Sequence, residues 1–238
     1  MLRKIMIMIL LILTVVWFTN SDSIQPAREF IQNNIYVWSE MQEEKLPIYC
    51  VDTQKKQIAL TFDTAWGNED IPQILKILKQ ENVKATFFLV GENAESNEKV
   101  VKRMYEEGHL IGNHTYSHIK LDECNISSAV GEINKTNEII KSITGEDVKY
   151  IRPPYGAYSD KLLSHVNMTP VLWSIDPDDW ATTDTAYVVK SVVYKVKNGD
   201  IILLHDIYDS SVEAALEIID RLSSKGFVFV TVDQLMLD

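Results

Sequence analysis

From Gln57 onward, short apolar runs alternate with longer segments in which apolar residues recur every three or four positions. The apolar runs predict seven strands, at residues 57–63, 85–90, 109–114, 150–154, 170–176, 200–206 and 227–232. The helical spacing predicts helices at residues 71–80, 97–107, 124–143, 159–166, 186–196 and 212–223. Strands that are apolar almost throughout and are separated by helices indicate a parallel sheet covered by helices.

Polar residues stand at the carboxyl ends of most of these strands. They are Asp63, His114, Arg152, Asp176 and His205. An open doubly wound sheet and a (β/α) barrel both fit the alternation, but an open sheet gathers only the loops at its switch point. A barrel brings the loops after all its strands to one face. We therefore predict an α/β fold, a (β/α) barrel of about seven parallel strands. No glycine-rich phosphate loop follows the first strand, so a nucleotide site is not supported.

The amino-terminal segment has a different pattern. Arg3 and Lys4 precede an apolar run at 5–18 and then polar residues, which is typical of an export signal. The run is shorter than the roughly 20 residues of a transmembrane helix. Because no small-residue cleavage site follows, residues 1–20 are either a signal peptide or a retained membrane anchor. We expect a tether at 21–54 and a folded domain at 55–238, secreted or anchored on the extracytoplasmic side.

Composition narrows the classes of partner. The chain has 238 residues and a net charge of −11, and no basic stripe is present that would bind nucleic acid phosphates. We expect contact with a membrane only through the amino-terminal segment. The two cysteines, Cys50 and Cys124, could form one disulfide or remain free thiols, and neither lies in a C-x-x-C motif.

His114 and His118 are the first candidates for chemistry. Two imidazoles four positions apart can bind one divalent metal if the backbone turns helically between them. Zinc and similar ions suit neutral imidazole ligands.

The other residues at the strand ends complete a set that is typical of metal-assisted hydrolysis. Asp63 offers a carboxylate as base or ligand, and Arg152 can pair with a carboxylate. His205 offers a proton donor that a nearby carboxylate, Asp179 or Asp206, could orient.

Five ordered motifs make a family resemblance specific. They are Thr61-Phe62-Asp63, His114-Thr115-Tyr116-Ser117-His118, Arg152-Pro153-Pro154-Tyr155-Gly156, Asp176-Pro177-Asp178-Asp179-Trp180 and Leu203-Leu204-His205. This series resembles polysaccharide deacetylases with a NodB-homology domain, carbohydrate esterase family four. The resemblance implies a distorted, incomplete (β/α) barrel and metal-dependent removal of N-acetyl groups from an N-acetylated glycan such as peptidoglycan. The first motif further resembles cell-wall deacetylases that include sporulation-associated members.

The resemblance also implies catalytic roles. His114 and His118 would hold the metal, with zinc the first choice. Asp63 would be the base, and Arg152 would hold it in place and keep it ionised. His205 would protonate the departing amine, oriented by Asp179.

Three further matched positions would contact the substrate. The backbone N–H of Tyr155 would stabilise the oxyanion, so this residue is both catalytic and substrate-binding. Trp180 and Leu203 would form an apolar slot for the acetyl methyl group.

Thr64 departs from the family pattern, which has a second aspartate at this position as a third metal ligand. A neutral hydroxyl is a weaker ligand than a carboxylate. Three alternatives follow: two histidines plus waters hold the metal, or another carboxylate (Asp63, Glu69 or Asp70) completes the set, or the protein binds glycan without hydrolysing it. We favour an active N-deacetylase over this inactive binding module, and rank an amidase or esterase for small acyl substrates third.

Overall fold

The computed structural model describes residues 46–64, 70–206 and 209–237. Within these ranges no helix has both the length and the apolar character that a membrane crossing requires. The predicted signal or anchor at 1–20 lies outside the described residues, so it stays a prediction.

Most of the expected tether at 21–54 also lies outside the described residues. Its last part contacts the domain: Ile48 forms a parallel bridge with Val171, and Cys50 forms an antiparallel bridge with Asp200. Cys50 and Cys124 are both free thiols. The boundary between tether and domain therefore stays a prediction.

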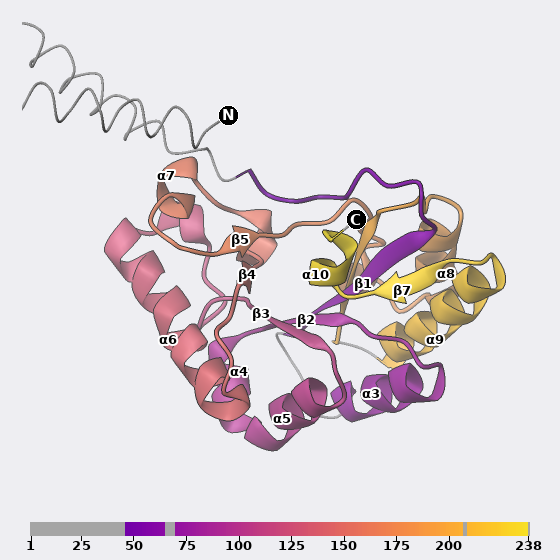
Figure 1. Cartoon of the computed structure of the whole chain (residues 1–238), viewed down its shortest axis with the longest axis horizontal. Coiled ribbons are helices and arrows are strands. Elements are labelled where there is room, and N and C mark those ends of the chain that lie inside the picture. The colour runs from indigo at the N-terminus through magenta and orange to yellow at the C-terminus, as the bar shows by residue number, and fades with distance from the viewer. Residues whose placement is uncertain (1–45, 65–69, 207–208, 238) are drawn as a thin grey trace, which may run out of the picture. The chain divides into compact units, whose positions relative to one another are not determined.

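Seven parallel strands form one curled sheet, which confirms the prediction of a distorted, incomplete (β/α) barrel (Figure 1). Their order is β5-β4-β3-β2-β1-β6, and β7 pairs with β1. The strands are β1 (Gln57–Thr64), β2 (Thr86–Leu89), β3 (Leu110–Asn113), β4 (Tyr150–Ile151), β5 (Thr169–Pro170), β6 (Ile201–His205) and β7 (Val228–Val230).

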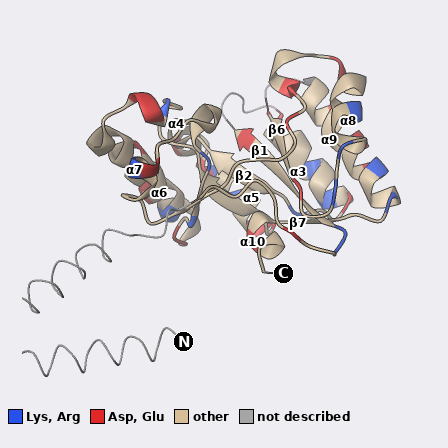
Figure 2. Cartoon of the chain, turned by 90° about the horizontal axis from the view of Figure 1, so that it is seen from above, with Lys and Arg blue, Asp and Glu red and all other residues tan. Residues whose placement is uncertain are grey.

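Helices cover the outside of the sheet, except that Val232 and Leu235 of the last helix pack with Ala59 and Phe88 on its inner face. The helices are α3 (Ile71–Gln80), α4 (Gly91–Ser96), α5 (Glu98–Glu106), α6 (Ile126–Thr144), α7 (Asp160–Leu163), α8 (Thr185–Val193), α9 (Asp209–Ser224) and α10 (Val232–Leu235). Single 3₁₀ turns lie at η2 (Leu121–Glu123), η3 (Pro154–Gly156) and η4 (Asp179–Ala181). Seen from above, α8 and α9 lie on one side of the strands, and α6 and α7 lie on the other (Figure 2).

The strand predicted at 170–176 is too long, because the chain changes partner along it. Only β5 pairs with β4, after which Val171 bridges Ile48 and Ile175 bridges Ile202 of β6. The backbone N–H groups of Ser174 and Ile175 both donate to the Ile201 carbonyl, at 3.0 and 3.2 Å. This segment draws the two edges of the sheet toward each other and produces the curl.

Strand register decides which side chains meet inside the curl. Asp63 of β1 lies directly opposite His205 of β6, and Thr61 lies opposite Leu203. Because side chains alternate along a strand, Phe62 points the other way, into the core beneath the helices. The register therefore brings polar residues from two neighbouring strands to the carboxyl end of the inner face.

Gly112 of β3 makes room for an aromatic ring on that inner face. It is the register partner of Phe88 in β2, and a Cβ added at Gly112 would lie 2.5 Å from the Phe88 ring. The ring in turn lies 4.2 Å from the guanidinium carbon of Arg152. The glycine thus permits the packing that supports a buried arginine.

We expect Gly112→Ala to lower the free energy of unfolding by about 1–3 kcal/mol, because the new methyl group overpacks against Phe88. Urea denaturation of the full-length protein measures the effect. Gly131→Ala is the matched control: it lies in α6 with nothing within 4 Å of its added Cβ. This control is expected to stabilise the helix by about 0.5–1 kcal/mol. Equal effects of the two substitutions would contradict the packing argument.

Candidate active site

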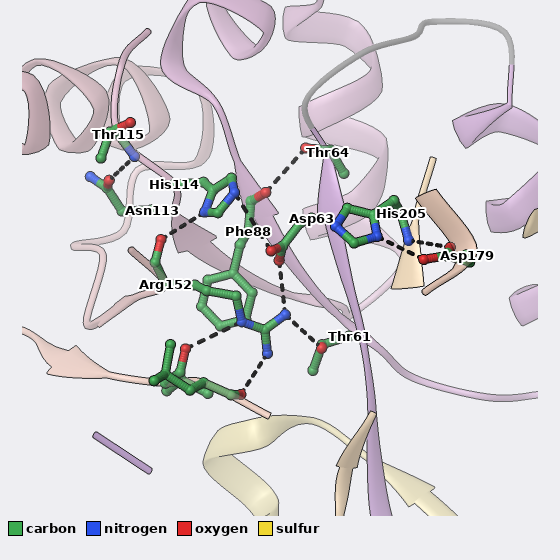
Figure 3. A network of polar contacts seen from close by, with 12 residues as sticks. Thr61, Asp63, Thr64, Phe88, Asn113, His114, Thr115, Arg152, Asp179 and His205 are labelled. Atoms are coloured by element: carbon green, nitrogen blue, oxygen red, sulfur yellow. Dashed lines mark hydrogen bonds and ion pairs between the residues drawn. The ribbon is translucent and has the colours of Figure 1, made fainter. Parts of the chain in front are cut away.

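A buried ion pair between Arg152 and Asp63 lies at the centre of the site (Figure 3). Arg152 follows β4 and is fully buried, and its Nη1 donates to Asp63 Oδ1 and to Thr61 Oγ1, both at 2.8 Å. Its Nε and Nη2 donate to the carbonyls of Val171 and Leu172, at 3.2 and 2.9 Å. The guanidinium is therefore bonded in three directions and cannot turn away from Asp63.

Asp63 is ionised despite its burial. Burial raises the pKa of a carboxyl group, but the charge of Arg152, together with His114 and His205, leaves the pKa of Asp63 below its usual value. The second carboxylate oxygen, Oδ2, lies 3.5 Å from His114 Nε2. This oxygen faces the site and can accept a proton.

His205 and Asp179 form a second pair beside Asp63. His205 Nδ1 lies 2.7 Å from Asp179 Oδ1, and the His205 backbone N–H donates to Asp179 Oδ2 at 2.8 Å. Burial lowers the pKa of an imidazole, but the hydrogen bond and charge of Asp179, with Asp63 and Asp176, raise the pKa of His205. The protonated imidazole is therefore favoured, and Nε2 is the ring nitrogen that is not bonded to Asp179.

The loop that carries His114 and His118 is not helical, so the expected helical turn between them is wrong. The backbone φ is +64° at Thr115 and +55° at His118, in the left-handed region. The two rings nevertheless approach each other, with centroids 4.9 Å apart. An irregular loop thus achieves the convergence that the sequence analysis assigned to a helix.

Both imidazoles are suited to bind a divalent cation. Burial lowers the pKa of His114, and burial together with His114 lowers the pKa of His118 to about 4, so both rings are neutral. His114 Nδ1 lies 2.7 Å from the Arg152 carbonyl. Nδ1 therefore carries the proton, and Nε2 keeps a lone pair toward the site.

Thr64, at the position where the family has a third metal ligand, is less suited to bind a metal than the two histidines. The Thr64 hydroxyl donates to the Phe88 carbonyl at 3.3 Å, so its proton is directed at the backbone (Figure 3). Among the residues that the structure describes, no three His, Cys, Asp or Glu side chains form a metal-binding group. Of the alternative carboxylates, Asp70 precedes α3 and Glu69 lies outside the described residues. The described side chains therefore offer a divalent ion two nitrogen ligands, one from His114 and one from His118.

The expected substrate-binding residues surround this centre. Tyr155 is 62% exposed, and its ring lies 4.8 Å from that of His118. Trp180 is half exposed in η4, whereas Leu203 is buried in β6 next to Thr61. An apolar slot between Trp180 and Leu203 remains a prediction.

Backbone strain gathers in the loops around the site. Among the described residues, five that are not glycine have a positive φ, and four of them lie here: Thr115, His118, Tyr155 and Asp178. Each such residue costs on the order of 1–3 kcal/mol, which the surrounding contacts must offset. At Tyr155 the value of +60° sets the direction of the backbone N–H that is the candidate oxyanion donor.

Sequence reasoning missed residues that hold the candidate catalytic side chains in place. Thr61 accepts from Arg152 and donates to the Ile202 carbonyl at 2.7 Å, and the buried Ser211 donates to Asp179 Oδ2 at 3.0 Å. Thr61 could have been found, because it stands two positions before Asp63 on the same face of one strand. Ser211 has no such signal, since only tertiary packing brings it to Asp179.

The chain matches the polysaccharide deacetylase family model over residues 51–171. It is 43% identical over 184 residues to the peptidoglycan-N-acetylglucosamine deacetylase of Bacillus cereus, covering 74% of this chain and 67% of that protein. The chain belongs to the polysaccharide deacetylase family. This is a family of hydrolases, and the resemblance drawn from the five motifs is confirmed.

Other family members extend the comparison. The peptidoglycan-N-acetylmuramic acid deacetylase PdaC of Bacillus subtilis is 40% identical over 185 residues, covering 78% of this chain but only 40% of that protein. A solved structure of a mutant of BA3943 from Bacillus anthracis, described as a CE4 family pseudoenzyme with restored enzymatic activity, has a TM-score of 0.77 and 32% identity. The match covers 83% of this chain and 73% of that one. The family therefore includes both enzymes and an inactive relative.

Removing Arg152 should leave Asp63 as an unpaired buried charge. We expect Arg152→Gln to cost about 3–5 kcal/mol of unfolding free energy at neutral pH. In an Asp63→Asn background the same change should lower the free energy of unfolding clearly less, since no buried carboxylate then loses its partner. Because the pKa of Asp63 is lowered in the folded state, the pair stabilises the folded protein at neutral pH. This contribution is lost as the pH falls and Asp63 becomes protonated. Urea denaturation of the four proteins measures the coupling, and additive costs would contradict it.

Proposed function

We propose that this protein removes N-acetyl groups from a cell-wall glycan, peptidoglycan or a related N-acetylated polysaccharide. One observation carries the proposal: the ionised, buried Asp63 lies between Arg152 and His114, and His205 on the neighbouring strand is paired with Asp179 of η4. A base and an acid with oppositely shifted pKa values are the arrangement that general acid–base hydrolysis needs.

The residues divide the reaction between them. Asp63 takes a proton from the water that attacks the acetyl carbonyl carbon, and Arg152 keeps this carboxylate ionised and in place. The Tyr155 N–H donates to the oxygen on which negative charge develops. His205 then gives its proton to the amide nitrogen, the C–N bond breaks, and acetate and a free amine leave. Asp179 orients His205 throughout.

His114 and His118 are the residues that would hold a divalent cation, with zinc as our first choice. When bound, such an ion would polarise the acetyl carbonyl and make the attacking water more acidic. Two neutral imidazoles can bind several divalent ions, so these two ligands do not select strongly for one metal.

The relatives and the amino-terminal sequence support the proposed substrate and location. The relatives are named as peptidoglycan deacetylases, and cell-wall glycan lies outside the membrane. The basic and apolar amino terminus would carry the domain there, as a cleaved signal or a retained anchor. The half-exposed Tyr155 and Trp180 would then face a glycan chain.

We expect the full-length protein loaded with Zn²⁺ or Co²⁺ to release acetate from N-acetylated glycan. Asp63→Asn should abolish release, and His205→Ala should reduce it by about 10²- to 10⁴-fold through loss of the proton donor. Circular dichroism verifies that each variant is folded. Loaded wild-type protein that leaves polymers and oligomers fully acetylated would count against the proposal. Faster release from small acetyl esters than from glycan would instead favour a general esterase.

A second candidate is a glycan-binding protein that does not hydrolyse its ligand. Thr64 favours it, because the position of the family's second aspartate carries a hydroxyl that is bonded to the Phe88 carbonyl. The similar Bacillus anthracis protein is described as a pseudoenzyme whose mutant regains activity. Binding without turnover would leave the Asp63–Arg152 pair intact as a structural element.

Thr64→Asp separates the two candidates. If wild-type protein is inactive, the added carboxylate should create acetate release, because it supplies a third, charged ligand beside the histidines. If wild-type protein is active, the same change should tighten Zn²⁺ binding and alter turnover far less. Thr64→Asn is the control, since it has the same shape as aspartate but no charge. Asparagine producing the same gain as aspartate would contradict the role assigned to the carboxylate.

A further inference from the structure

The loop of residues 114–118, here called the histidine loop, is held by neighbouring elements in a conformation it would not adopt alone. Its two left-handed residues, Thr115 and His118, are not glycine. We infer that Glu132 of α6 is a positioning residue that clamps the histidine loop, so that both imidazoles are set for a divalent cation before it binds. The use of that cation rests on the proposed function.

Glu132 bonds to the middle of the histidine loop with one carboxylate oxygen. Its Oε2 accepts from the backbone N–H of Tyr116 at 3.1 Å and from that of Ser117 at 2.8 Å. The same oxygen accepts from the Ser117 hydroxyl at 2.9 Å. A carboxylate is suited to this task, because hydrogen bonds to a charged acceptor are stronger than those between neutral groups. These bonds satisfy the N–H groups of the segment that links the two histidines.

Asn113 and α6 hold the start of the loop. Asn113 Oδ1 accepts from the Thr115 N–H at 2.7 Å, a local turn that tolerates the left-handed backbone. Asn113 Nδ2 donates to the Ile133 carbonyl at 2.8 Å and to Asn137 Oδ1 at 2.7 Å. One helix thus fixes the loop through Asn113 at one end and through Glu132 in the middle.

The loop carbonyls are bonded by a second helix, α4. The backbone N–H groups of Gly91 and Glu92, at the start of α4, donate to the carbonyls of Thr115 and Tyr116, at 2.8 and 3.0 Å. Gly91 allows this approach, since an added Cβ would lie 2.8 Å from the Tyr116 ring. The Tyr116 ring also lies under Lys135 Nζ, 3.2 Å from its centroid. The loop is therefore held between α4 and α6.

This clamp has greater weight in this chain because Thr64 provides no carboxylate as a third metal ligand. With two imidazoles as the protein's nitrogen ligands, affinity depends on how well their separation is set in advance. Groups that orient metal-binding histidines without touching the ion affect affinity by about 10- to 100-fold when removed. Glu132 is the charged group that organises the segment between them.

The test is a Co²⁺ titration of metal-free, full-length protein, followed by the visible absorption of the bound ion. We expect Glu132→Ala to weaken Co²⁺ binding by about 10- to 100-fold. Glu132→Gln should weaken it less, because the amide oxygen still accepts but carries no charge. Glu138→Ala, an exposed position on the same helix, is the matched control and should bind like wild type. Thermal unfolding identifies any variant that fails to fold. If Glu132→Ala fails to fold, the Co²⁺ affinity of Glu132→Gln decides whether the inference holds.

Wild-type affinity in Glu132→Ala would overturn the inference, and so would an absence of Co²⁺ binding by the wild-type protein. Acetate release is measured on the same samples to separate the two proposals. Graded loss of Co²⁺ affinity without any acetate release supports the clamp and counts against the deacetylase. Acetate release by wild type with unchanged Co²⁺ affinity in both Glu132 variants supports the deacetylase and overturns the clamp.

Discussion

The buried guanidinium of Arg152 is the group on which the rest of the site depends. A charge in the protein interior is tolerated only when hydrogen bonds and an opposite charge replace the water it has lost. Arg152 finds these partners on β1, in the segment after β5 and, through its stacking on Phe88, on β2. The partners come together only when the sheet has curled. The curling of the sheet and the formation of the buried, ionised Asp63 are therefore one structural event.

The two halves of the site are held by different means. Asp63, Arg152 and His205 belong to strands or directly follow them, and hydrogen bonds inside the barrel fix them. The histidine loop is fixed from outside, by α4 and α6. Thr64 makes its side-chain hydrogen bond to the Phe88 carbonyl, so a change at position 64 leaves the Asp63–Arg152 bond in place. This separation explains how a chain can carry Thr64 and keep the other candidate catalytic residues in register.

The sequence predicted the fold well, for an identifiable physical reason, whereas the roles of the site residues stay predictions. Apolar runs such as 57–63 are buried on both sides, so their pattern survives in the structure as β1. The short β5 was not predictable, because its extent depends on a change of pairing partner. The histidine loop was predicted to turn helically, since sequence spacing cannot reveal bonds to Glu132 from 15 or 16 residues away. Local pattern thus predicted the elements, while tertiary contacts decided the loop conformations.

The pairing of Asp63 with His205 across β1 and β6 has a consequence for how this scaffold can diversify. The two residues are register partners on hydrogen-bonded strands, so the roughly 4.8 Å repeat between strands sets the spacing of their backbones. Loop insertions or deletions around the rim leave that spacing unchanged. The surface formed by the loops can therefore change while the backbone spacing of the two residues proposed as base and acid stays constant.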